Sequence, residues 1–101
     1  MAMLAATRGT GLKIALGTDE NHGKLYEEVQ TLRDAGYAPM ESLVAATQSG
    51  ADLCGIAGQA GTLEPGKRAD VIAVQGDPLA DAGCLANVRF VMKAGEVELR
   101  A

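Results

Sequence analysis

The sequence predicts a small α+β fold, and three observations carry that prediction. A short alternating apolar run occupies residues 12–18. Two amphipathic helical patterns come next, at about 24–35 and about 39–54, and an alternating hairpin pattern lies at 88–99. The chain has 101 residues, which is enough for one small domain.

The run at 12–18 predicts a β-strand that ends on a candidate catalytic residue. Leu12, Ile14 and Leu16 fall on one face by the two-residue period, and Gly-Thr-Asp stands at 17–19. In parallel α/β architectures the carboxyl ends of the strands carry the active site. Asp19 is therefore the candidate for chemistry, and the alternative is an aspartate that only opens the next turn or caps a helix.

The two helices are predicted from apolar residues at helical spacing. Leu25, Val29 and Leu32 lie at i, i+4 and i+7 in the first helix, which Gly36 would end. The second helix would begin at Pro39, because proline suits the first helical position. Its apolar face is expected to comprise Met40, Leu43, Val44 and Thr47.

From about residue 58 the composition changes to turns and strands, which divides the chain into regions 1–57 and 58–101. A Pro-Gly turn at 65–66 precedes a short apolar strand at 69–74, and Ala-Gly at 94–95 would turn the hairpin at 88–99. Asp70 and Asp77 are expected to organise turns through bonds from side chain to backbone. Lys67 and Arg68 are expected to be exposed.

Charge and composition argue against several classes of function. The formal net charge is -4, and no basic stripe is present to neutralise phosphates, so nucleic acid is not an expected partner. No apolar run approaches the ~18 residues of a membrane span, so no membrane is expected either. Cys54 and Cys84 do not form a CxxC pair and are interpreted as reduced thiols of a cytoplasmic protein.

The order of motifs resembles the C-terminal end of a metal-dependent amidohydrolase. Gly-Thr-Asp at 17–19 and His-Gly at 22–23 precede two helices, the second of which contains Pro-Met-Glu-Ser-Leu at 39–43 and Ala-Ala-Thr at 45–47. The stretches at 61–70 (GTLEPGKRAD) and 76–79 (GDPL) are similar to the superfamily's C-terminal signature. Residues 91–97 (VMKAGEV) are similar to its closing hairpin. The branch most similar to this chain comprises the imidazolonepropionase- and prolidase-related amidohydrolases.

The resemblance implies a fold and a set of roles. Residues 12–18 would form the eighth strand of a TIM-like (β/α)8 barrel, followed by its last helices, and residues 58–101 would belong to the flanking composite β-sandwich. Asp19 would be the strand-eight aspartate that contacts the metal and carries the proton of the hydrolytic water. His22 would bind substrate at the barrel mouth, and the alternative is a solvated loop histidine. The implied reaction is hydrolysis of an amide or cyclic-amide C–N bond in a small molecule by a metal-activated water.

The metal site implied by the resemblance is incomplete in this sequence. A divalent metal, with zinc expected in the intact enzyme, needs about three or four protein ligands. The superfamily draws them from a His-x-His on its first strand, a lysine or equivalent on the fourth, and histidines on the fifth and sixth. This chain has one histidine and no His-x-His. The isolated chain is therefore expected to bind no metal and to be inactive.

Two interpretations of the chain as a whole are open at this point. The first is a truncated hydrolase, which the start of the sequence close to the expected last barrel strand favours. The second is a non-catalytic structural or interaction module with an amidohydrolase-derived fold. In both cases a strand without its neighbours exposes unpaired N–H and C=O groups, so a homo-oligomer is expected.

Overall fold

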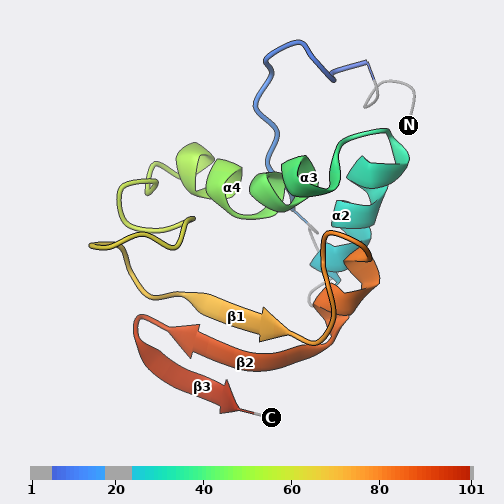
Figure 1. Ribbon diagram of the computed structural model, residues 1–101. Coiled ribbons are helices and arrows are strands. Elements are labelled where there is room, and N and C mark those ends of the chain that lie inside the picture. The colour runs from blue at the N-terminus through green and yellow to red at the C-terminus, as the bar shows by residue number, and fades with distance from the viewer. Residues whose placement is uncertain (1–5, 18–23, 101) are drawn as a thin grey trace.

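The computed structural model describes residues 6–17 and 24–100. Within these ranges, the helices α2 (Leu25–Asp34), α3 (Pro39–Ala46) and α4 (Gln48–Leu53) precede strand β1 (Val71–Val74). A 3-10 helix, η1 (Ala82–Ala86), then leads to strands β2 (Val88–Lys93) and β3 (Glu96–Arg100). Figure 1 shows the helices on one side of the molecule and the sheet on the other, with η1 next to α2.

The helices lie within the ranges that their apolar spacing predicts. Val29 and Leu32 of α2 are buried, whereas Leu25, the third residue of the predicted stripe, is 38% exposed. Gly36, which follows the C-cap residue Ala35, adopts a φ of 101°, a value that favours glycine. At the start of α3 the Glu41 carboxylate accepts a hydrogen bond of 2.8 Å from the backbone N–H of Ala38. This bond satisfies one of the N–H groups that a helix N-terminus leaves without an intrahelical partner.

The face that α3 buries differs from the predicted one. Ser42 and Ala45 are buried, whereas Met40 is 56% exposed and Thr47 is also exposed. The reason is that small side chains let α3 approach α2 closely, and the Ser42 hydroxyl is satisfied there by hydrogen bonds. The backbone at Thr47, with φ -124° and ψ -80°, separates α3 from α4.

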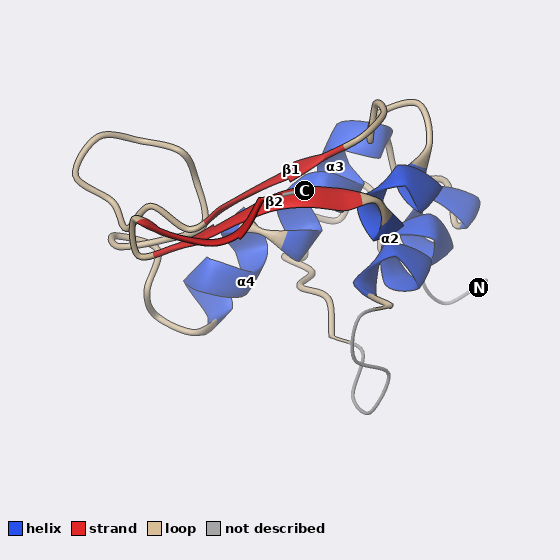
Figure 2. Cartoon of the chain, turned by 90° about the horizontal axis from the view of Figure 1, so that it is seen from below, coloured by secondary structure: helices blue, strands red, loops and turns tan. Residues whose placement is uncertain are grey.

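The strands form one antiparallel sheet in the order β1-β2-β3. Val71 pairs with Met92 and Ile72 with Val91 between the first two strands, and Val91 pairs with Leu99 between the last two. The tight turn at 94–95 has positive φ values, as hairpin turns of two residues require. Figure 2 shows the molecule from below, with β1 and β2 crossing the view and α2 beyond one end of the strands.

The core is small and lies between α2, α3, α4 and η1. Its buried apolar residues are Val29, Leu32, Ala35, Ala45, Ala51, Ala60, Ala82 and Cys84. On β3, by contrast, all five residues are exposed. None of the helices in the described ranges has both the length and the hydropathy needed to cross a membrane.

Two further predictions need correction. Of the strand expected at 12–18, the described residues 12–17 have no strand assignment in this chain, and no described strand lies against them. Lys67 is not a freely exposed side chain. It is 16% exposed and its Nζ donates a 2.7 Å hydrogen bond to Thr62 Oγ1, while Arg68, at 45%, is exposed as predicted.

Both turn-organising aspartates are confirmed. Asp77 Oδ1 accepts a hydrogen bond of 3.0 Å from the N–H of Leu79, two residues further along the chain. Asp70 Oδ1 accepts one of 2.8 Å from the N–H of Ala94, in the turn between β2 and β3. Both cysteines are free, Cys54 on the surface and Cys84 in the interior.

Candidate functional site

The two candidate site residues, Asp19 and His22, lie outside the described residues. What the structure does place is the chain on either side of them. Residues 12–17 lead toward Asp19, and α2 begins at Leu25, shortly after His22. The predicted roles of these two side chains therefore stay predictions.

The segment 12–17 is held against the helices by one polar contact from within the segment and by another from a residue that precedes it. Lys13 Nζ lies 2.9 Å from Asp52 Oδ2 of α4, and both groups retain contact with solvent. Before the segment, the hydroxyls of Thr7 and Tyr37 are hydrogen-bonded to each other. Ile14 and Leu16 are partly buried, whereas Leu12 is 62% exposed. The chain thus approaches Asp19 along the helices rather than within a sheet.

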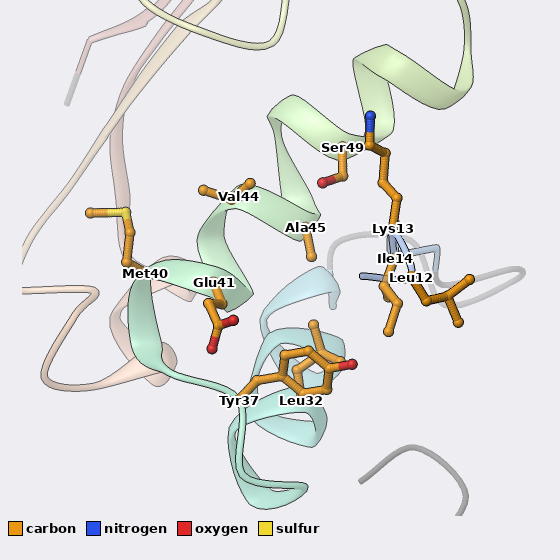
Figure 3. Close-up of a pocket in the computed structure, with 10 residues that line it drawn as sticks. All are labelled: Leu12, Lys13, Ile14, Leu32, Tyr37, Met40, Glu41, Val44, Ala45 and Ser49. Carbon is orange, nitrogen blue, oxygen red and sulfur yellow. The ribbon is translucent and has the colours of Figure 1, made fainter. Parts of the chain in front are cut away.

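A small cavity of about 250 Å³ lies between this segment and the helices. Figure 3 shows Leu12 and Ile14 entering it from one side, with Leu32 and Tyr37 below them. Glu41, a carboxylate in its lining, is engaged with the backbone N–H of Ala38. The cavity is lined by Leu12, Lys13, Ile14, Leu32, Tyr37, Met40, Glu41, Val44, Ala45 and Ser49. Its charged groups serve the local structure, so it is a gap in apolar packing rather than a site of chemistry.

A larger, open cavity of about 600 Å³ separates β1 from α3 and α4. Val44, Thr47 and Gln48 line one side, and Val71 and Ile72 line the other. Asp70, which also borders it, is engaged in the turn of the β2–β3 hairpin. The cavity therefore offers apolar surface and side-chain amide or hydroxyl groups, but its carboxylate already has a structural role.

The described residues do not provide a donor set for a metal ion. Within ranges 6–17 and 24–100, no three His, Cys, Asp or Glu side chains gather closely enough to hold one. A protein metal site needs about three or four such donors. Any metal held with the help of this chain would therefore take its remaining ligands from outside these ranges.

Sequence reasoning missed two polar contacts that organise this region. One is the Lys13–Asp52 pair, whose signal was a single cation within an otherwise apolar alternating run. The other joins Arg33 of α2 to Ser42 of α3, with 2.9 Å between Nε and Oγ. No spacing rule reports a pair nine residues apart on two different helices, so the sequence alone carried no signal for it.

Comparison with known proteins agrees with this architecture. The model of the family described as "Amidohydrolase family" matches residues 1–99. An imidazolonepropionase of Syntrophobacter fumaroxidans is 39% identical over 72 residues, covering 65% of this chain and 17% of the relative. A 5-methylthioadenosine/S-adenosylhomocysteine deaminase of Teredinibacter turnerae is 39% identical over 83 residues, covering 69% and 19% respectively.

A solved structure shares the fold over almost the whole chain. It is a Xaa-Pro dipeptidase with methionine bound in the active site, and it is 35% identical with a TM-score of 0.90. The match covers 96% of this chain and 25% of the dipeptidase. The chain thus spans less than a fifth of the length of the two curated relatives and a quarter of this structural relative.

Proposed function

Because this chain belongs to the amidohydrolase family, we propose that it is the C-terminal part of a metal-dependent hydrolase that cleaves amide or cyclic-amide C–N bonds. The observation that carries the proposal is the TM-score of 0.90 to the Xaa-Pro dipeptidase over 96% of this chain. The relatives' names support the same class of reaction, since they denote hydrolytic enzymes acting on small molecules. The substrate is proposed to be a small-molecule amide.

The proposal assigns each half of the chain to a part of a larger fold. Residues 1–57 would form the end of a TIM-like barrel, with 12–18 as its last strand, and residues 58–101 would form part of the flanking β-sandwich. Two features support this assignment. Residues 12–17 are alternating and apolar yet have no strand partner among the described residues, and β3 is fully exposed. Both are expected of surfaces that a larger fold would cover.

Asp19 is proposed as the catalytic carboxylate of this chain and as its one metal ligand. Its support is its place after an apolar alternating run, which is where barrel enzymes carry catalytic groups. A carboxylate there can accept and pass on a proton during hydrolysis. His22, three residues later, is proposed to bind substrate.

The amidohydrolase family is generally metal-dependent, and we propose a divalent ion, zinc, for the intact enzyme. The described residues of this chain do not fit such an ion by themselves. The chain alone is therefore proposed to be inactive and to hold no stoichiometric zinc. A cytoplasmic location and a homo-oligomeric state complete the proposal.

A graft tests this function directly. The matching quarter of the Xaa-Pro dipeptidase is replaced by this chain, and hydrolysis of Xaa-Pro dipeptides is measured. The graft is expected to be active, and its Asp19→Asn variant is expected to lose about 100-fold or more in kcat/KM, the contribution of a positioned proton-transfer group.

The matched control is Glu27→Gln in the same graft, because Glu27 is an exposed carboxylate in the first turn of α2. Its activity should equal that of the unmodified graft. Equal activity of the Asp19→Asn variant and the unmodified graft would contradict the role of Asp19. A folded graft without any activity would instead favour the non-catalytic module.

A further inference from the structure

We propose that Arg33 is a latch that holds the β-sheet half of the chain on the helices. The latch consists of the Arg33 guanidinium, the Ser42 hydroxyl, and the backbone carbonyls of Pro39 and Pro78. It joins α2 and α3 to the turn between β1 and η1. Arg33 belongs to α2, the first described helix after the segment that contains Asp19. The latch therefore connects the sheet half of the chain to that helix. This role concerns the folding of the chain and goes beyond the proposed reaction.

The Arg33 side chain contacts two separate parts of the chain, α3 at Ser42 and Pro39 and the turn between β1 and η1 at Pro78. Nε donates to Ser42 Oγ at 2.9 Å. One terminal nitrogen, Nη2, lies 2.5 Å from the Pro78 carbonyl oxygen and 3.5 Å from that of Pro39. The Ser42 hydroxyl, which is fully buried, donates in turn to Pro39 O at 2.6 Å. A planar guanidinium with several donors suits such a junction, because hydrogen bonds from a charged donor are stronger than neutral ones.

The turn that presents the Pro78 carbonyl is held rigidly by its own residues. Asp77 Oδ1 accepts the N–H of Leu79 at 3.0 Å, and the Asp77 carbonyl accepts the N–H groups of Ala80 and Asp81. Gly76 has a φ of 113°, and a Cβ at this position would lie 2.9 Å from the Cβ of Cys84. The Gly-Asp-Pro sequence thus has a physical role, which is to fix a carbonyl oxygen in front of Arg33.

Among the residues that the structure describes, the apolar packing that supports the latch lies beside η1. Val29 and Leu32 of α2 are buried, as are Ala82 and Cys84 of η1, and the two elements are in contact. Further from the latch, the cavity of about 600 Å³ separates β1 from α3 and α4, and Ile72 is 56% exposed. The sheet is therefore held mainly at the η1 end, and losing the latch should loosen that end first.

Hydrogen exchange of single amides in the 101-residue chain tests the latch. The test amides are those of Ala80 and Asp81 in the turn, and the reference amides are those of Leu32 in α2 and Val91 in β2. Arg33→Met should raise exchange at the test amides about tenfold or more, as expected when bonds from a charged donor are lost, and should leave the reference amides nearly unchanged.

Two further variants complete the design. Arg89→Met is the matched control, because Arg89 is exposed and bonds only Gln75 Oε1 among the hydrogen bonds found for its side chain in the described residues. It removes the same charge and should leave the test amides unchanged. Ser42→Ala removes the acceptor of Arg33 Nε and should raise exchange at the same amides by a smaller factor, which keeps the test decisive if Arg33→Met does not fold.

The latch would be overturned by any of three results. The first is unchanged exchange at Ala80 and Asp81 in Arg33→Met. The second is an equal rise at the test and reference amides in both Arg33→Met and Ser42→Ala, which would indicate general destabilisation. The third is the same rise at the turn in Arg89→Met, which would indicate an effect of net charge.

Discussion

Lys13 and Asp52 form an ion pair with 2.9 Å between Nζ and Oδ2, and this pair ties the segment leading to Asp19 onto α4. The segment has no strand partner in the part of the chain that the structure describes, so its position depends on side-chain contacts. The Thr7–Tyr37 hydroxyl contact lies just before it in the chain. The direction in which the chain approaches Asp19 is thus set by a few polar contacts on the surface of the helices.

A double-mutant cycle with Lys13→Met and Asp52→Asn measures the strength of this pair. The Lys13 side chain is 61% exposed and that of Asp52 is 29% exposed, so solvent screens their attraction. We expect a coupling energy of about 0.5 kcal/mol in urea unfolding at low ionic strength, and a smaller one in high salt. A coupling energy that does not fall with added salt would show that the contact is not electrostatic.

Leu32 should carry far more of the stability than leucines at the surface. Its side chain is 2% exposed, whereas Leu53 is 77% exposed. Leu32→Ala should lower the free energy of unfolding by about 2–5 kcal/mol because it leaves a cavity in the core. Leu53→Ala, the matched control, should change it by no more than about 0.5 kcal/mol in the same urea titration. Similar effects of the two substitutions would contradict the described core.

Alanine substitutions at two glycines with positive φ distinguish the cost of backbone strain from the cost of steric contact. Gly66 has a φ of 88° with no atom within 4 Å of an added Cβ, whereas Gly76 has the close contact with Cys84. Gly66→Ala should cost about 1 kcal/mol of stability through backbone strain alone. Gly76→Ala should cost at least about 1 kcal/mol more, because overpacking adds to the backbone strain at its φ of 113°. Thermal unfolding of both variants checks the difference, and equal costs would disprove the contact.

Self-association should depend on the exposed sheet. Val97 and Leu99 of β3 are 43% and 44% exposed, and Ile72 of β1 is 56% exposed. Open strand edges and apolar patches favour association, so sedimentation velocity should give a dimer or a larger species. Leu99→Lys should shift the chain toward monomer, and Leu63→Lys, at a loop residue that is 77% exposed, should not. A monomer at every concentration would contradict the expectation.

The sequence predicts the helices and the hairpin well because their signals are local. Helical spacing marks Leu25, Val29 and Leu32; Val29 and Leu32 are buried, whereas Leu25, at the start of α2, is 38% exposed. The Ala-Gly pair at 94–95 marks the hairpin turn, and the turn forms there. The local pattern predicts wrongly where a neighbouring strand or helix decides whether a segment forms a strand or which helix face is buried. Residues 12–17 have a strand pattern but no strand beside them in the described structure. Helix α3 buries Ser42 rather than Met40, because Arg33 of α2 donates a hydrogen bond to the Ser42 hydroxyl.

The candidate site region likewise combines a residue with a local sequence signal and contacts that have none. Asp19 is proposed as a site residue from its place after an apolar run, which is a local signal, and it lies outside the described residues. The Arg33 latch depends on Pro78, 45 residues further along the chain, and η1 depends on packing against α2. Contacts between segments so far apart in the sequence leave no period or motif to detect. They had to be observed in the folded chain.

The most direct test of the proposed function is the position of the Asp19 carboxylate in a crystal of the dipeptidase graft, with the metal located by anomalous scattering. We expect one carboxylate oxygen to lie about 2.0–2.2 Å from the metal, the distance of a coordinating aspartate. A metal held by the other ligands, with Asp19 outside coordination distance and hydrogen-bonded only to its own turn, would contradict the proposed role.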